Sequence, residues 1–171
     1  YMKYLITACL LFVAFVTSGQ KSTLINTTVD EFTGEKMIST ELIEFKSMVS
    51  YGGGLMFSLH HMNGSNYLAA IVSTSGLTTM DEYQRMIIKL VDGSLINLSC
   101  LEYAISEYKS GSTYHLAPVF GLTDDDLTKL STLQIERIRF ETSDGNIDME
   151  PSKKSPATCM AAFAEFKAVV K

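Results

Sequence analysis

The stretch Arg85–Cys100, RMIIKLVDGSLINLSC, contains the strongest signal for the fold of this chain. Two runs of apolar and β-branched residues flank the pair Asp92-Gly93, and this arrangement predicts a β-hairpin with a two-residue type I′ turn. Such a turn would place Leu90 opposite Leu95. One face would then hold Met86, Ile88, Leu90 and Leu95, and the other Ile87, Val91, Ile96, Leu98 and Cys100. Because both faces are apolar, we expect a second sheet or a helix to cover each of them.

Three further glycine-bearing turns separate strand-like runs elsewhere in the chain. Thr33–Lys36 lies between runs at about 22–32 and 37–49, Asn63-Gly64 is a second type I′ pair, and Ser143–Asn146 closes a fourth hairpin. No glycine pattern of a dinucleotide-binding or P-loop motif follows any of these runs. The pattern therefore indicates a domain made mostly of antiparallel β-structure.

Two helices are expected beside the strands. Thr123 can cap a helix over about 123–131, and Asp126, three residues later, completes a capping box. Residues 155–170 have apolar residues at helical spacing, which form one stripe: Cys159, Phe163, Phe166 and Val170. We therefore predict an α+β domain, mainly an antiparallel β-sheet or sandwich of about eight strands, with a short helix near 123–131 and a C-terminal helix near 155–170 packed on it.

Residues 1–19 are typical of an export signal. Lys3 gives the segment a positively charged N-terminal region, and residues 5–16 form an apolar run. The small residues Thr17-Ser18-Gly19 then precede an expected cleavage site before Gln20. The apolar run is shorter than the roughly 20 residues that a membrane-spanning helix needs, so we favour cleavage over a retained anchor and expect no stable membrane span afterwards. The sequence thus predicts an exported protein, periplasmic or secreted, with residues 20–171 as a single β-rich domain.

The charge of the chain excludes one class of partner. The residues after the predicted signal contain 13 Lys and Arg against 19 Asp and Glu, which gives a net charge of −6. Nucleic acids and anionic lipid surfaces are bound through clustered Lys and Arg, which this composition does not favour. We therefore expect no nucleic-acid partner.

Cys100 and Cys159 are the two cysteines that follow the predicted signal. Cys100 shares a strand face with Ile96 and Leu98, and Cys159 lies on the apolar stripe of the C-terminal helix, so both are expected to point inward. Two interpretations follow. They are two buried, unreactive thiols, which is the common state of buried cysteine, or they form a disulfide if that strand packs under that helix.

Three histidines are the first candidates for a metal or catalytic site. His60 and His61 are adjacent on a strand and point to opposite faces, so they are poorly placed to bind one ion together. A zinc site would need His115 or carboxylates from elsewhere, and no H-x-x-x-H or C-x-x-C spacing is present. The acidic residues 124–126 do not match a calcium-binding loop. No serine lies in a G-x-S-x-G elbow, and no motif predicts a cofactor.

Tyrosines are concentrated in residues 102–118, a stretch rich in Ser and Gly that we expect to be a long loop or an edge segment. They are Tyr103, Tyr108 and Tyr114. On an exposed loop such side chains can stack on sugars or anchor a protein partner, because each joins a large apolar face to a polar tip. They can equally pack the loop onto the sheet, but this segment is the first place to look for binding.

Four short segments resemble a known group of proteins. They are Val29–Lys36 (VDEFTGEK), Leu122–Leu127 (LTDDDL), Ile135–Arg139 (IERIR) and Asp144-Gly145. With a signal that ends before Gln20, they are similar to small exported proteins of Bacteroidota-type bacteria, most of which have no assigned function. The resemblance implies a periplasmic or secreted location and a β-rich domain, and it implies no catalytic residue.

Two functions are therefore expected from the sequence. The first is an exported, non-catalytic binding or interaction domain of the cell envelope, whose partner is a protein, a peptide or a glycan. The alternative is a small periplasmic hydrolase or metal-binding protein that uses the histidines and nearby acidic residues.

Overall fold

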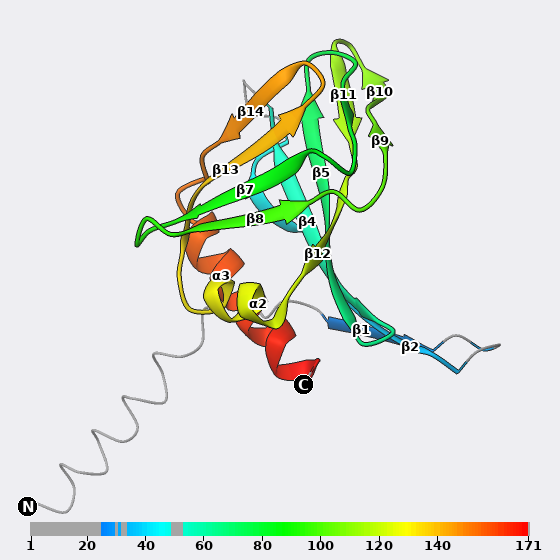
Figure 1. The fold of residues 1–171 in the computed structure, drawn as a ribbon, viewed down its shortest axis with the longest axis vertical. Helices are drawn as coiled ribbons and strands as arrows, with labels where there is room; N and C mark the ends of the chain where they lie inside the picture. The colour runs from blue at the N-terminus through cyan, green and yellow to red at the C-terminus, as the bar shows by residue number, and fades with distance from the viewer. Residues whose placement is uncertain (1–24, 30, 32–33, 49–52, 171) are drawn as a thin grey trace, which may run out of the picture.

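A computed structural model describes residues 25–29, 31, 34–48 and 53–170 of the chain. The expected export signal, residues 1–19, lies outside the described residues. Within them the chain forms three antiparallel sheets and two helices, which confirms the predicted α+β class (Figure 1).

The largest sheet has eight strands, in the order β1-β2-β4-β5-β11-β10, with β3 paired to β4 and β12 paired to β5. Its strands are β1 (Ile25–Val29), β2 (Lys36–Thr40), β3 (Ile43–Lys46), β4 (Leu55–Met62), β5 (Ser65–Thr74), β10 (Glu107–Ser110), β11 (Thr113–Leu116) and β12 (Val119–Leu122). Two of them, β1 and β2, extend as a ribbon away from the body of the domain (Figure 1).

The second sheet has four strands in the order β14-β13-β7-β8 and lies across the first (Figure 1). Its strands are β7 (Arg85–Leu90), β8 (Leu95–Ser99), β13 (Ile135–Thr142) and β14 (Gly145–Met149). A small third sheet pairs β6 (Thr79–Met80) with β9 (Ala104–Ile105). The described residues thus contain more strands than the eight expected, partly because residues 102–118 form short strands along an edge and not a loop.

The helices α2 (Asp124–Leu130) and α3 (Ser155–Val169) close one end of the sandwich (Figure 1). The predicted capping box is present, since Thr123 Oγ1 accepts a hydrogen bond from Asp126 N at 3.1 Å and Asp126 Oδ2 accepts one from Thr123 N at 3.0 Å. Cys159, Phe163 and Phe166 on α3 are buried, as their spacing predicts. In the described part of the chain, neither helix has the length and apolar character to span a membrane.

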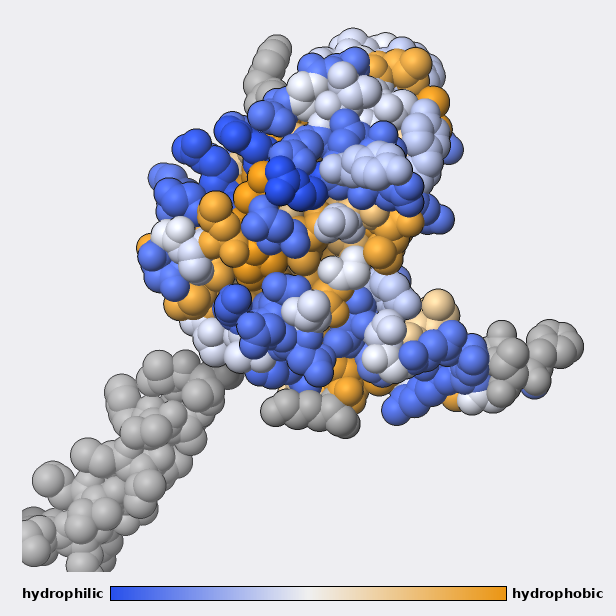
Figure 2. All heavy atoms as spheres, viewed as in Figure 1, coloured by the Kyte–Doolittle hydropathy of each residue, from blue (hydrophilic) through white to orange (hydrophobic). Residues whose placement is uncertain are grey.

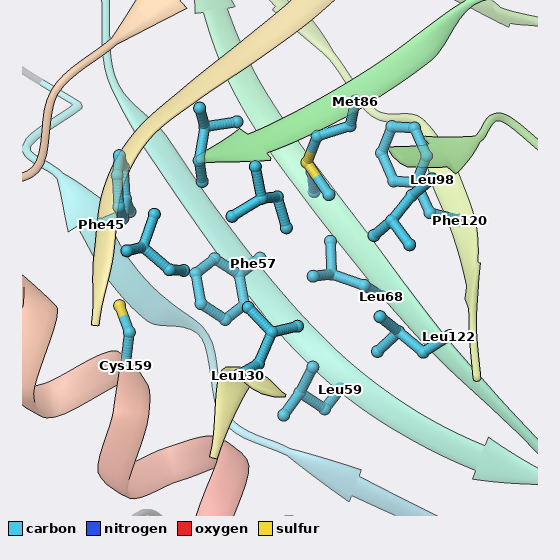
Figure 3. Close-up of a cluster of buried hydrophobic side chains, with 14 of the residues drawn as sticks. Phe45, Phe57, Leu59, Leu68, Met86, Leu98, Phe120, Leu122, Leu130 and Cys159 are labelled. Atoms are coloured by element: carbon cyan, nitrogen blue, oxygen red, sulfur yellow. The ribbon is translucent and has the colours of Figure 1, made fainter. Parts of the chain in front are cut away.

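The hydrophobic core lies between the two large sheets and extends under the helices (Figure 3). Phe120 on β12 packs on Phe140 on β13, with 6.2 Å between ring centroids, and joins the two sheets. Phe57 on β4 stacks on Phe163 of α3 at 5.5 Å and joins the larger sheet to the helix. Since each of these rings is almost completely buried, they contribute much of the hydrophobic stabilisation of the domain.

The register of the β7–β8 hairpin differs by one residue from the predicted one. Ile88 pairs with Ile96 and Lys89 with Leu95, so the loop contains three residues, Val91 to Gly93, and not two. Leu90 and Gly93 close the turn through a backbone hydrogen bond of 2.9 Å, and only Gly93 has a positive φ, at 86°. This is the three-residue loop in which a glycine follows a type I turn, whereas a type I′ turn needs two residues of positive φ.

The shift of one residue also corrects the predicted faces. Because side chains alternate along a strand, the shift carries Ile96 and Leu98 to the same side as Ile88. The buried face contains Met86, Ile88, Leu90, Ile96, Leu98 and Cys100. The other face is open to solvent, so the hairpin is covered on one side and not on both as expected.

Ion pairs cover much of this open face, and they connect neighbouring strands. They are Arg85–Glu141, Lys89–Glu136, Arg137–Glu150 and Arg139–Asp148, with N–O distances of 2.6 to 2.9 Å. The guanidinium of Arg139 lowers the pKa of Asp148, and that of Arg85 lowers the pKa of Glu141, mainly through side-chain hydrogen bonds. In Figure 2 hydrophilic residues gather over β13 and β14, and hydrophobic residues are interspersed along β7 and β8.

The two cysteines are buried and free, so the structure does not contain the disulfide that was one of the two interpretations. Cys100 forms an isolated β-bridge with Phe120, and its Sγ donates a hydrogen bond to Glu102 O at 3.1 Å. Cys159 lies on α3, which packs mainly against β3 and α2. Burial raises the pKa of Cys100, and it raises the pKa of Cys159 to about 12, so both thiols are protonated and weakly nucleophilic at neutral pH.

The left-handed conformation of Gly93 leads to a first prediction. Gly93→Ala is expected to lower the free energy of unfolding by about 1–2 kcal/mol, because a residue with a Cβ is strained at positive φ. Gly93→Asn is expected to lower it less, since asparagine tolerates this region. Urea denaturation measures both. Gly76→Ala is the control, because Gly76 lies outside the left-handed region and has open space around it; equal losses in the two alanine variants would contradict the assigned loop.

The state of the cysteines gives a second prediction. Iodoacetamide at pH 8 is expected to leave Cys100 and Cys159 unlabelled in the native protein and to label both in guanidinium without a reductant, because unfolding exposes two free thiols. Mass spectrometry of the labelled peptides distinguishes the positions. If labelling in guanidinium appeared only after a reductant was added, Cys100 and Cys159 would be joined by a disulfide. The assignment of two free thiols would then be wrong.

Candidate functional site

A large cavity is lined by the turn between β13 and β14 and by the β10–β11 hairpin. These two turns lie at the end of the sandwich opposite the helices (Figure 1). The cavity has a volume of about 900 Å³. Residues from three parts of the chain line it, within 73–78, 109–115 and 142–147, together with Met48 and Gly53. Ligand cavities of proteins commonly have volumes of roughly 300–1,000 Å³, so this one is large enough for a small molecule.

Hydrogen bonds within the lining hold these segments in place. Thr142 Oγ1 donates to Gly145 O at 2.8 Å, within the β13–β14 turn. Thr79 N donates to Ser143 Oγ at 3.1 Å, and this bond ties that turn to the segment after β5. Ser143 N donates to Thr79 O at 3.0 Å and completes the pair. The cavity wall is therefore built before any ligand arrives.

Other polar side chains of the lining make no hydrogen bond within the part of the chain that the structure describes. They are Ser73, Ser75, Ser110, Ser112, Thr113, His115 and Asn146. A hydroxyl group can donate one hydrogen bond and accept two, and an amide can both donate and accept. The cavity thus presents a set of neutral donors and acceptors.

The charges at the cavity largely balance. Lys109 forms an ion pair with Glu107 at 3.3 Å, and Asp144 lies on the opposite side, in the β13–β14 turn. A lining with one cation, already paired, and one carboxylate has no strong preference for an anion or a cation. The chemistry of the cavity therefore suits a neutral polar molecule.

The β10–β11 hairpin brings together three of the six residues named from the sequence. Tyr108 pairs with Tyr114 across the strands, and the rings meet edge to face with 5.7 Å between centroids. His115 is the next residue along β11, and its side chain therefore lies on the other face of the hairpin, where it lines the cavity. The tyrosine pair consequently packs outside the cavity. Tyr103 lies apart from it, exposed in the segment before β9.

His60 and His61 lie on β4, in a different part of the domain. They pair with Tyr67 and Asn66, as the Asn63-Gly64 turn predicts, and the positive φ values of 53° and 72° in that turn confirm type I′. His61 Nδ1 lies 2.7 Å from Asn66 Oδ1, and its side chain borders a second cavity of about 410 Å³ beside the end of α3. The histidines are therefore not gathered in one place, and no three His, Cys, Asp or Glu side chains within residues 25–29, 31, 34–48 and 53–170 form a group that could hold a metal.

In the described part of the chain, His60 forms the one contact that resembles a hydrolase, because its Nε2 lies 2.8 Å from Ser58 Oγ. Burial lowers the pKa of His60, which keeps the imidazole neutral and able to accept a proton. Ser58 and His60 are two residues apart on β4, so their contact follows from the pleat of the strand. Among the described residues no carboxylate orients the imidazole, as it does in a catalytic triad, and neither residue borders either cavity.

Of the polar residues that line the large cavity, only His115 was named from the sequence. The signal that the others share is composition: 73–76, 110–113 and 142–146 are short stretches of Ser, Thr, Gly, Asn and Asp. Such stretches predict turns, and Ser143–Asn146 was assigned to a turn and residues 102–118 to a loop or an edge segment. That three of them meet at one end of a sandwich follows only from the pairing of β5 with β11 and from the contact of the β13–β14 turn with residue 79.

Comparisons of the chain with models of known protein families, with curated protein sequences and with solved structures give no match.

Proposed function

We propose that this protein is an exported, non-catalytic binding domain of the cell envelope, and that its ligand site is the 900 Å³ cavity at the open end of the sandwich. The observation that carries the proposal is a preformed cavity lined by neutral polar side chains without partners in the described part of the chain. Export is inferred from residues 1–19, which have the composition of a signal.

The chemistry of the lining favours a carbohydrate. A sugar presents several hydroxyl groups, and each can donate and accept hydrogen bonds, as do the side chains of Ser110, Ser112 and Thr113 on the hairpin and Asn146 on the facing turn. The near balance of charge disfavours a strongly anionic or cationic ligand. Glycans were among the partners expected from the sequence, and we propose this cavity as the site where one binds.

Binding is favoured over hydrolysis by the arrangement of the same residues. General acid–base catalysis needs a base within hydrogen-bond distance of the group that it deprotonates. Among the described residues His115 has no serine, cysteine or carboxylate hydrogen-bonded to it at the cavity, and Asp144 has no second carboxylate beside it in the lining. Among the residues that the structure describes, the Ser58–His60 pair is the only contact that supports the hydrolase alternative, and neither residue lines the cavity.

The test is a binding measurement with two variants of the lining. Calorimetry against a panel of neutral mono- and oligosaccharides is expected to give a ligand whose affinity falls by about threefold to tenfold in Thr113→Val and in Asn146→Ala, because each substitution removes a hydrogen bond of about 0.5–1.5 kcal/mol. Thr28→Val, on the exposed strand β1, makes the same change outside the cavity and is expected to bind like the unmodified protein.

Two results would contradict the proposal. One is a saccharide that binds equally to the unmodified protein, Thr113→Val and Asn146→Ala, since the site would then lie elsewhere. The other is the absence of binding across the panel together with turnover of an ester or amide substrate that is lost in Ser58→Ala, which would establish the hydrolase alternative.

A further inference from the structure

Exposed apolar side chains gather on two neighbouring segments, 77–83 and 101–105. They supply five of the thirteen large apolar or aromatic side chains that are exposed in the described residues, and their exposed fractions range from 50% to 83%. The five are Leu77, Tyr83, Leu101, Tyr103 and Ile105. We refer to them together as the tyrosine patch. Scattered apolar residues on a surface are ordinary, but a contiguous group marks an interaction site.

The five side chains lie on two segments that run side by side. Thr79 pairs with Ile105 on β6 and β9, and Cys100 N donates a hydrogen bond to Gln84 O at 3.1 Å, so the segments adjoin at both ends. Between β6 and β7 the chain makes a turn, in which Gln84 N donates a hydrogen bond to Asp81 O at 3.0 Å. All five side chains are exposed on these adjoining segments.

Carboxylates surround the tyrosine patch. Asp81, Glu82 and Glu102 lie within its two segments, and residues 75–84 and 100–108 contain no Lys or Arg. Asp81 and Glu102 both help to raise the pKa of Cys100, which places the two carboxylates near the same thiol.

The charges of the patch differ from those of the adjoining sheet face. There Glu136, Glu141, Asp148 and Glu150 each have a Lys or Arg partner. Within the described part of the chain, Asp81, Glu82 and Glu102 have no such partner. The patch therefore combines apolar surface with negative charge that the protein itself does not neutralise.

From this combination we propose that the tyrosine patch binds a cationic, amphipathic polypeptide segment, one that alternates Lys or Arg with apolar side chains. Burial of the apolar residues would supply affinity, and the carboxylates would select and orient a positive partner. A second copy of this chain is a poor occupant because its net charge is −5. The patch adjoins the proposed carbohydrate cavity at Leu77, whose neighbours Gly76 and Thr78 line it, but the two share no residue. The proposal does not depend on the function given above.

The experiment uses three synthetic peptides of equal length and fluorescence anisotropy with the purified protein. One alternates Lys with Leu and Phe, the second has Glu in place of Lys, and the third has Ser in place of Leu and Phe. Only the first is expected to bind, more weakly as salt is added. Its affinity is expected to fall at least tenfold in Tyr103→Ser/Ile105→Ser and in Glu82→Lys/Glu102→Lys, all four positions being exposed.

Matched controls change the same chemistry elsewhere on the surface. Val91→Ser/Leu95→Ser removes exposed apolar residues at the tip of the β7–β8 hairpin, and Glu31→Lys/Glu41→Lys reverses two exposed charges. Both are expected to keep the affinity within twofold. Three results would overturn the proposal. They are equal losses of affinity in the control and patch variants, equal binding of the Lys–Ser peptide, and no binding of any peptide at millimolar concentration. A dimer in sedimentation experiments that the patch substitutions dissociate would also overturn it, because the occupant would then be a second copy.

Discussion

The register of the β7–β8 hairpin is the constraint on which the rest of the domain depends. Gly93 at positive φ closes a three-residue loop, and this loop determines which residues of β8 lie on the same face as the core residues of β7. The inward set joins Phe120 and Phe140 between the sheets. The outward set includes Arg85 and Lys89 of the ion-pair network. A shift of one residue between β7 and β8 would turn Ile96 and Leu98 outward and Asn97 inward, which would expose apolar surface and bury an amide.

Helices cover one end of the sandwich and polar turns form the other, and the candidate site lies at the end without helices. At one end Phe163 stacks on Phe57, and the helices exclude water from the core. At the other end no helix covers the sheets in the described part of the chain, and short polar turns line a cavity that is open to solvent. Polar groups that face water cost little to leave without protein partners. The polar side chains that line this cavity can therefore lack protein partners without destabilising the domain, and they are available to bind a ligand.

Local signals in the sequence predicted much of this fold. The Asn63-Gly64 turn gave the right register because both of its residues adopt positive φ, and the capping box and the Cys159–Phe163–Phe166 stripe gave the right helices. The Asp92-Gly93 turn misled because Asp92 keeps a negative φ, while its Oδ1 accepts hydrogen bonds from Ser94 N and Ser94 Oγ at 3.0 and 2.7 Å. The two turns have similar sequences, so whether a two-residue or a three-residue loop forms depends on how the strands pair with the rest of the sheet. The cavity could not be predicted, because its three segments meet only through contacts between residues more than 30 positions apart.

The two proposals together give the domain two binding surfaces, a neutral polar cavity and a negatively charged apolar patch. Amide chemical-shift mapping of the ¹⁵N-labelled protein tests them most directly, with a neutral oligosaccharide and with the Lys–Leu–Phe peptide added in turn. We expect the sugar to shift the amide signals of Ser112 and Asn146 and to leave those of Glu82 and Tyr103 unchanged, and the peptide to do the reverse. If both ligands moved the same amides, or if the largest changes were at Ser58 and His60, the two-surface account would be contradicted.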